Sequence, residues 1–110
     1  MKSQIALFLA LCVLAPARAD MSYRSYQQTK GQAATQAHVP ALGSGVSWGI
    51  SFMNRDRSPV TVCPPEIVFN RTNYEDFVER GANLTSADLR PSMPIALLML
   101  EGMKSAFPCR

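Results

Sequence analysis

The chain has 110 residues, of which 47% are hydrophobic and 17% are charged, and its formal net charge is +3. A chain of this length folds as one small domain, and its core buries a smaller share of the surface than the core of a larger protein does. The eleven Lys and Arg residues are scattered along the sequence, which argues against a nucleic-acid or anionic-membrane partner.

The N-terminus has the layout of a cleavable secretion signal. Lys2 precedes an uncharged apolar run at residues 4–15, and a small-x-small triplet follows at residues 17–19. Because the run is shorter than the roughly 20 residues that a membrane-spanning helix needs, we expect residues 1–19 to be a signal peptide that is cleaved before Asp20. No membrane span is expected after cleavage. Nine basic and eight acidic residues then remain, a net charge of +1.

Two cysteines remain after signal removal, because Cys12 leaves with the signal. They are Cys63 in VCPPE and Cys109 in AFPCR. In an oxidising compartment an even pair of cysteines indicates a structural disulfide. A reactive thiol would instead need a helix N-terminus, a neighbouring histidine or a CxxC spacing, and neither cysteine has one. The loop-closure model gives a bridge across this separation roughly 4 kcal/mol of stabilisation.

Two segments with different patterns follow the signal. Residues 20–37 are polar and rich in Gln, Ser and Thr, so we expect a mobile N-terminal segment, with a short helix as the open alternative. A helical domain is expected over residues 38–110. Its first helix is predicted at residues 39–57, where apolar residues recur at helical spacing. We expect its large apolar side chains to pack in the core: Trp48, Phe52 and Met53.

Two further helices are predicted. Pro59 ends the first helix, and Thr72 is the expected N-cap of the second, with Glu75 completing a capping box. After a polar loop at residues 83–94, the last helix is expected to begin at Ser92 as N-cap and to stop before Pro108. The expected fold is therefore a small all-α domain of three to four helices with one disulfide.

The residues give little support for catalysis. His38 is the single histidine, and a triad around it would need a nucleophile that the sequence does not identify. Metal binding lacks HxxH and CxxC spacings, and the glycines at residues 43–45 lack the spacing and the lysine of a phosphate-binding loop. We therefore expect a non-enzymatic protein without a metal or another cofactor.

Three stretches of the chain carry a family resemblance. LGSGVSWGISF at residues 42–52 resembles a glycine-bearing helix, VCPPE at residues 62–66 resembles a Cys-x-Pro-Glu turn, and PSMPIALLMLEGMKSAFPC at residues 91–109 resembles a last helix that ends in Ala-Phe-Pro-Cys. Together they are similar to the Rap/Tai family of periplasmic immunity proteins. An earlier cysteine pair that many members carry is absent from this chain.

The resemblance implies a function and a site. Members are small all-α proteins, often dimeric, that inhibit cell-wall-cutting amidases delivered by type VI secretion. This chain would then bind a cognate amidase toxin in the periplasm of a Gram-negative bacterium, and the resemblance allows a homodimer. We expect the loop before the last helix to contact the toxin, and Leu84 and Leu89 could instead cover the core. The nominated residues are Asn83, Leu84, Asp88, Leu89 and Arg90.

Two other interpretations stay open. The first is a periplasmic acid-stress chaperone of the HdeA type, which is also small, helical, secreted and held by one disulfide. Its cysteines lie on helices and its chain is rich in Lys and Asp, whereas the cysteines here are flanked by prolines. The second is a structural or envelope-associated domain.

Overall fold

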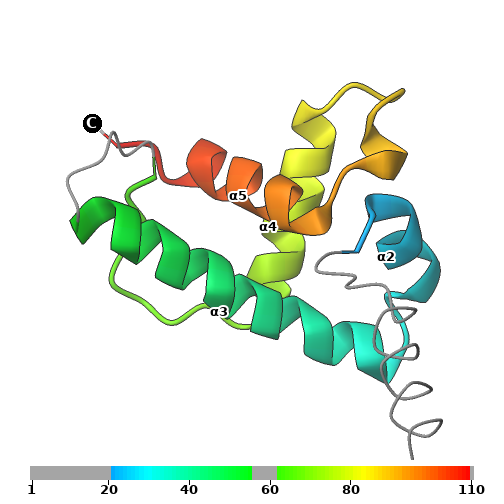
Figure 1. The fold of residues 1–110 in the computed structure, drawn as a ribbon, viewed down its shortest axis with the longest axis horizontal. Coiled ribbons are helices and arrows are strands. Elements are labelled where there is room, and N and C mark those ends of the chain that lie inside the picture. Colours follow the sequence, from blue (N-terminus) through cyan, green and yellow to red (C-terminus); the bar gives the residue numbers. More distant parts are fainter. Residues whose placement is uncertain (1–20, 56–61, 110) are drawn as a thin grey trace, which may run out of the picture.

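The computed structural model describes residues 21–55 and 62–109, which form an all-α fold (Figure 1) held by one disulfide. Both features confirm the prediction from the sequence. The predicted signal peptide, residues 1–19, and Pro59 lie outside the described residues. The described helices follow one another as α2 (Tyr23–Thr29), α3 (Ala33–Arg55), α4 (Arg71–Leu84), the short 3₁₀ helix η1 (Arg90–Ser92) and α5 (Ile95–Ala106).

The centre of the fold is the crossing of α4 and α5. Gly81 of α4 lies against the backbone of Leu98, and Gly102 of α5 lies against the backbone of Phe77. A Cβ atom at either glycine would overlap the carbonyl oxygen of the opposite helix, so glycine is what allows this close approach. The largest fully buried side chains of the fold come mainly from these two helices and include Val78, Ile95, Leu98, Met99 and Met103.

Helix α3 is long and lies beside the α4–α5 pair (Figure 1). Its buried side includes Val39, Gly43 and Ile50, and the Cα atom of Gly43 lies against the ring of Tyr74 in α4. The helix begins at Ala33, earlier than predicted, and it continues through Pro40 although a proline removes one backbone hydrogen bond. The apolar contacts on this side outweigh that loss.

The N-terminal segment differs from the mobile state that we expected. The Ser22 side chain caps α2 by accepting a hydrogen bond from the backbone N–H of Ser25, at 3.2 Å. Tyr23 and Tyr26, three residues apart, are both buried. The apolar area of these two rings offsets the polar composition of the segment. The helix that the sequence left open is therefore present.

Backbone hydrogen bonds also tie this segment to the start of α5. The N–H of Tyr23 donates to the carbonyl of Met93 at 2.9 Å, and the N–H of Ile95 donates to the carbonyl of Met21 at 2.8 Å. The pair of bonds forms a short antiparallel bridge around Ser22. The first described residues of the chain are thus fixed to the loop that leads into the last helix.

The predicted start of the second helix is wrong. Asn70, and not Thr72, is the N-cap of α4. Its side chain accepts from the N–H of Asn73, and the side chain of Asn73 accepts from the N–H of Asn70, both at 2.9 Å. This reciprocal pair is a capping box in which an asparagine takes the place that we assigned to Glu75.

The predicted start of the last helix is also wrong. Helix α5 begins at Ile95, with Pro94 at its N-cap position. Ser92 instead belongs to η1, where its hydroxyl donates to the carbonyl of Leu89 at 3.0 Å. The 3₁₀ turn satisfies its backbone groups locally. Ser92 therefore belongs to this turn, which precedes α5, and does not cap α5 as we predicted.

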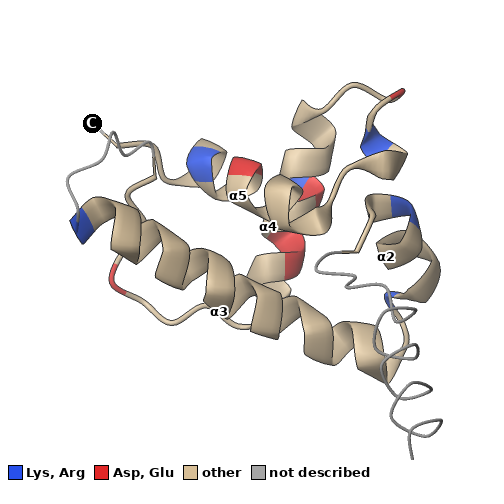
Figure 2. Ribbon diagram, in the orientation of Figure 1, with Lys and Arg blue, Asp and Glu red and all other residues tan. Residues whose placement is uncertain are grey.

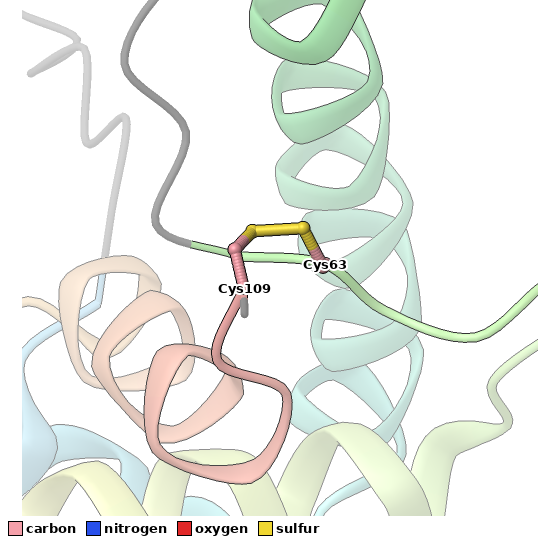
Figure 3. The surroundings of a disulfide bond; sticks show 2 residues. All are labelled: Cys63 and Cys109. Carbon is pink, nitrogen blue, oxygen red and sulfur yellow. A yellow bond between two sulfur atoms is a disulfide. The ribbon is translucent and has the colours of Figure 1, made fainter.

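The disulfide joins Cys63, ahead of α4, to Cys109, after α5 (Figure 3). The two Cα atoms are 5.0 Å apart. Beside the bond, the N–H of Cys63 donates to the carbonyl of Phe107 at 2.8 Å, and Val62 pairs with Pro108 in an isolated β-bridge. Covalent and backbone bonds together fix the segment before α4 to the end of the chain.

An aromatic cluster continues this connection into the core. Phe69, at the end of the segment that Cys63 begins, stacks on Phe107 with ring centroids 5.7 Å apart. Its edge contacts with Phe77 and Tyr74 have centroid distances of 5.1 and 5.8 Å. Such pairs contribute about 0.5–1.5 kcal/mol each beyond area burial. The segment at residues 64–68 is therefore held at both ends.

Candidate partner-binding surfaces

The residues that the sequence nominated for partner contact lie at the end of α4, in the loop that follows it and at the start of η1. Leu84 and Leu89 are 63% and 59% exposed, so the alternative that they cover the core is wrong. Asn83 and Asp88 are exposed as well. Four of the five nominated side chains are thus accessible to a partner in the described part of the chain.

Arg90, the fifth nominated residue, has a different place. Its Nε–H donates to the carbonyl of Ala82 at 2.7 Å, and its Nη2 donates to the carbonyl of Thr85 at 3.0 Å. These carbonyls belong to the C-terminal end of α4, where the helix leaves backbone acceptors without their usual partners; the Ala82 carbonyl also accepts from the N–H of the C-cap Thr85 at 3.1 Å. The guanidinium therefore shapes the loop, and the prediction that it is free for partner contact is not supported by this geometry.

A second exposed surface lies on the outward side of α3. Trp48 and Phe52 are 71% and 61% exposed, and Met53 is exposed too. The prediction that these side chains pack in the core is wrong. Trp48 and Phe52 are one helical turn apart, so they share one side of the helix, while the buried Ile50 lies on the other side. The core thus uses only one of the two apolar stripes of α3.

Two hollows flank this part of α3. The first lies between α3 and the extended segment at residues 64–69, and Trp48, Ile67 and Val68 are among its lining residues. The second lies between α3 and α5, with Met53 and Leu97 in its lining. Val68 is 98% exposed, although Phe69 beside it is packed in the aromatic cluster. Both hollows are open at the surface.

Charge is absent from α3 except at its end. Residues 31–54 contain no Lys, Arg, Asp or Glu, and Figure 2 shows α3 without a charged residue before Arg55. Helix α4 carries residues of both signs up to Arg80 (Figure 2). The centres of protein interfaces are depleted of charged residues and enriched in Trp, Phe and Met. This composition is typical of a surface that another molecule covers.

We did not nominate Ile67, Val68 or the outward side of α3 from the sequence. Two features of the sequence could have indicated them. The first is the uncharged run at residues 31–54, which is longer than one buried stripe requires. The second is the pair of β-branched residues that follows Pro64 and Pro65, where the rigid chain leaves little freedom to bury both side chains.

The titratable groups inside the fold have structural roles. The hydroxyl of Tyr23 donates to a carboxylate oxygen of Glu79 at 2.8 Å, and burial, together with this hydrogen bond, raises the pKa of Tyr23. Burial, followed by the charge of Glu75, raises the pKa of Tyr26 to about 12. The Tyr23 hydrogen bond joins α2 to α4.

The described residues contain no group of three or more His, Cys, Asp and Glu side chains that could hold a metal ion. His38 lies on α3 and is partly buried. None of the helices described at residues 21–55 and 62–109 has the length and hydropathy to cross a bilayer.

Comparison with known proteins adds no relative. No protein-family model matches the chain, no curated protein matches it, and no solved structure has a significantly similar fold. The Rap/Tai resemblance therefore depends on the sequence pattern of this chain alone.

Proposed function

We propose that this protein is a non-enzymatic periplasmic immunity protein that binds and inhibits a cognate peptidoglycan amidase toxin. The observation that carries the proposal is the disulfide between Cys63 and Cys109. It joins VCPPE to AFPCR, the two cysteine-bearing stretches on which the resemblance to the Rap/Tai family depends. A bridge between these two stretches is what an inhibitor of that family would need to hold its last helix.

The segments near the disulfide and after α4 are held in fixed positions, which suits a protein that binds a partner. Binding costs less free energy when the contacting groups are already ordered, because less conformational entropy is lost. The loop at residues 83–90 is held by Arg90, and the segment at residues 64–68 is held by the disulfide and by Phe69. Both present exposed apolar side chains on a fixed backbone, so a partner can contact them without first having to order the chain.

The proposed compartment is the periplasm. The predicted signal at residues 1–19 would carry the chain out of the cytoplasm, and a disulfide persists in an oxidising compartment. Peptidoglycan lies in that compartment, so an inhibitor placed there meets the toxin where the toxin acts.

The proposal is tested by protection of cells. The amidase encoded beside this gene is directed to the periplasm of a bacterium, with this chain co-expressed in full or without residues 1–19. We expect the full chain to prevent lysis and the chain without its signal to fail. Lysis in the presence of the full, correctly exported chain, or the absence of any amidase gene in the neighbourhood, contradicts the proposal. Suppression of client aggregation at low pH without amidase binding would instead support the chaperone.

A further inference from the structure

Exposed large apolar side chains are unevenly distributed over the described residues. Two of the eight are Leu84, the last residue of α4, and Leu89 in the loop that follows. The others gather on the second half of α3, on the extended segment beside it and on α5 where it borders the second hollow. We call these six residues the α3 surface: Trp48, Phe52, Met53, Ile67, Val68 and Leu97.

The shape of the α3 surface is a ridge between two hollows. Trp48 and Phe52 form the ridge, because they project from the side of α3 opposite to Ile50, and the two hollows lie along its flanks. Gly45 and Gly49 have no atom within 4 Å of the position where a Cβ would be. The backbone of a partner can therefore approach α3 closely at these two positions.

The absence of charge along α3 limits which kind of molecule can bind the α3 surface. Helices that lie on a membrane surface carry Lys and Arg along their polar side, but residues 31–54 have none. A charged partner surface would lose hydration without gaining an ion pair. The complementary surface is therefore uncharged and apolar, and it is concave because it has to receive a ridge.

We propose that α3 is the element that enters the partner, and that the occupant of the α3 surface is an uncharged, apolar cleft of the amidase. This inference rests on the proposed function. An enzyme holds its catalytic groups in a cleft, and an amphipathic helix that lies in a groove is a recurring mode of recognition. Trp48 and Phe52 are then the central anchors, and the loop at residues 83–90 lies outside the main contact.

The test compares two matched double variants with the wild-type chain by calorimetric titration into the amidase encoded beside the gene. The first is Trp48→Ala with Phe52→Ala, and the second is Leu84→Ala with Leu89→Ala. We expect at least ~30-fold weaker binding for the first, since central aromatic anchors carry most of the binding free energy. For the second we expect a change of less than about 3-fold. All four side chains are exposed, so both variants should unfold at the wild-type denaturant concentration.

A third variant tests the absence of charge directly. Gly49→Glu places a carboxylate on the exposed side of α3 where no atom of the chain lies near. We expect binding to weaken at least ~10-fold while the unfolding midpoint stays unchanged or rises. Unchanged binding of this variant would contradict the proposal that the cleft of the amidase is uncharged.

Other outcomes overturn the inference in distinguishable ways. If the Leu84/Leu89 variant loses amidase binding and the Trp48/Phe52 variant keeps it, the α3 surface is not the binding surface, and the proposed immunity function is unaffected. If the wild-type chain binds no amidase, both proposals fail. If sedimentation shows a wild-type dimer that the Trp48/Phe52 variant abolishes while amidase binding persists, a second copy is the occupant. If the wild-type chain binds phosphatidylglycerol vesicles through Trp48 and Phe52, the surface contacts lipid instead.

Discussion

Gly102 of α5 lies so close to Phe77 of α4 that a Cβ atom would overlap the carbonyl oxygen of Phe77. The contact is with backbone, so no change of a side-chain rotamer can relieve the overlap. Because the end of α5 leads directly to the disulfide at Cys109, the position of this crossing also sets where the segment around Cys63 is held.

Gly102→Ala should destabilise the protein by about 3 kcal/mol, at the upper end of the range for overpacked cores, because the two helix backbones would have to separate. Gly45→Ala is the matched control. Gly45 is also in a helix but has open space around it, so alanine should stabilise by up to about 1 kcal/mol. Urea unfolding of both variants measures the difference, and equal midpoints would contradict the close crossing.

Removal of the disulfide should cost roughly 4 kcal/mol, on the loop-closure model for a separation of 46 residues. The variant is Cys63→Ser with Cys109→Ser, measured by denaturant unfolding against the oxidised wild-type chain. Mass spectrometry with and without reductant should show a gain of two hydrogens only after reduction. A free thiol in the untreated protein would contradict the bridge on which the proposed function depends.

Stability should fall above pH 10. Burial raises the pKa of Tyr26 from 10.0 to about 12 in the folded chain, so the unfolded state loses its proton first and is favoured as the pH rises. The contribution of Tyr26 is complete below pH 10 and disappears as the pH passes about 12. In Tyr26→Phe the free energy of unfolding should fall less steeply between pH 10 and 12 than in the wild-type chain. An equally steep fall would show that other groups cause it.

Arg90→Ala should loosen the loop after α4. The carbonyls of Ala82 and Thr85 lose the guanidinium as a donor, and only Ala82 keeps another donor, the N–H of Thr85. Hydrogen bonds to a charged group contribute about 1.5–3 kcal/mol each to stability. Because the site is only partly buried and water can replace a donor, we expect a total loss of about 2 kcal/mol. Amide exchange should accelerate at residues 85–89 and stay unchanged in α5. Uniform acceleration would indicate global unfolding instead.

Local sequence patterns predicted much of this fold. The even pair of cysteines that remains after the predicted signal, without the neighbours of a reactive thiol, predicted the disulfide between Cys63 and Cys109, and helical periodicity predicted the three longer helices. The starts of α4 and α5 were wrong because several Ser, Thr and Asn residues stand near each helix end. Which of them serves as cap depends on where packing lets the helix begin.

The sequence could not predict the side of α3 that meets the core. Both stripes of this helix are apolar, and an exposed Trp48 has the same local pattern as a buried one. The choice follows from tertiary contacts, such as that of Gly43 with the ring of Tyr74. Likewise, the local sequence does not show that α4 offers Glu79 as an acceptor for the hydroxyl of the buried Tyr23.

The most direct test of the central claim is inhibition of the purified amidase encoded beside this gene. Peptidoglycan hydrolysis is followed while the oxidised chain, residues 20–110, is added in increasing amounts. We predict that activity falls in proportion to added protein and disappears once each amidase molecule has a partner, and that Trp48→Ala with Phe52→Ala fails to inhibit at the same concentration. Full amidase activity in an excess of the wild-type chain would contradict the proposed function.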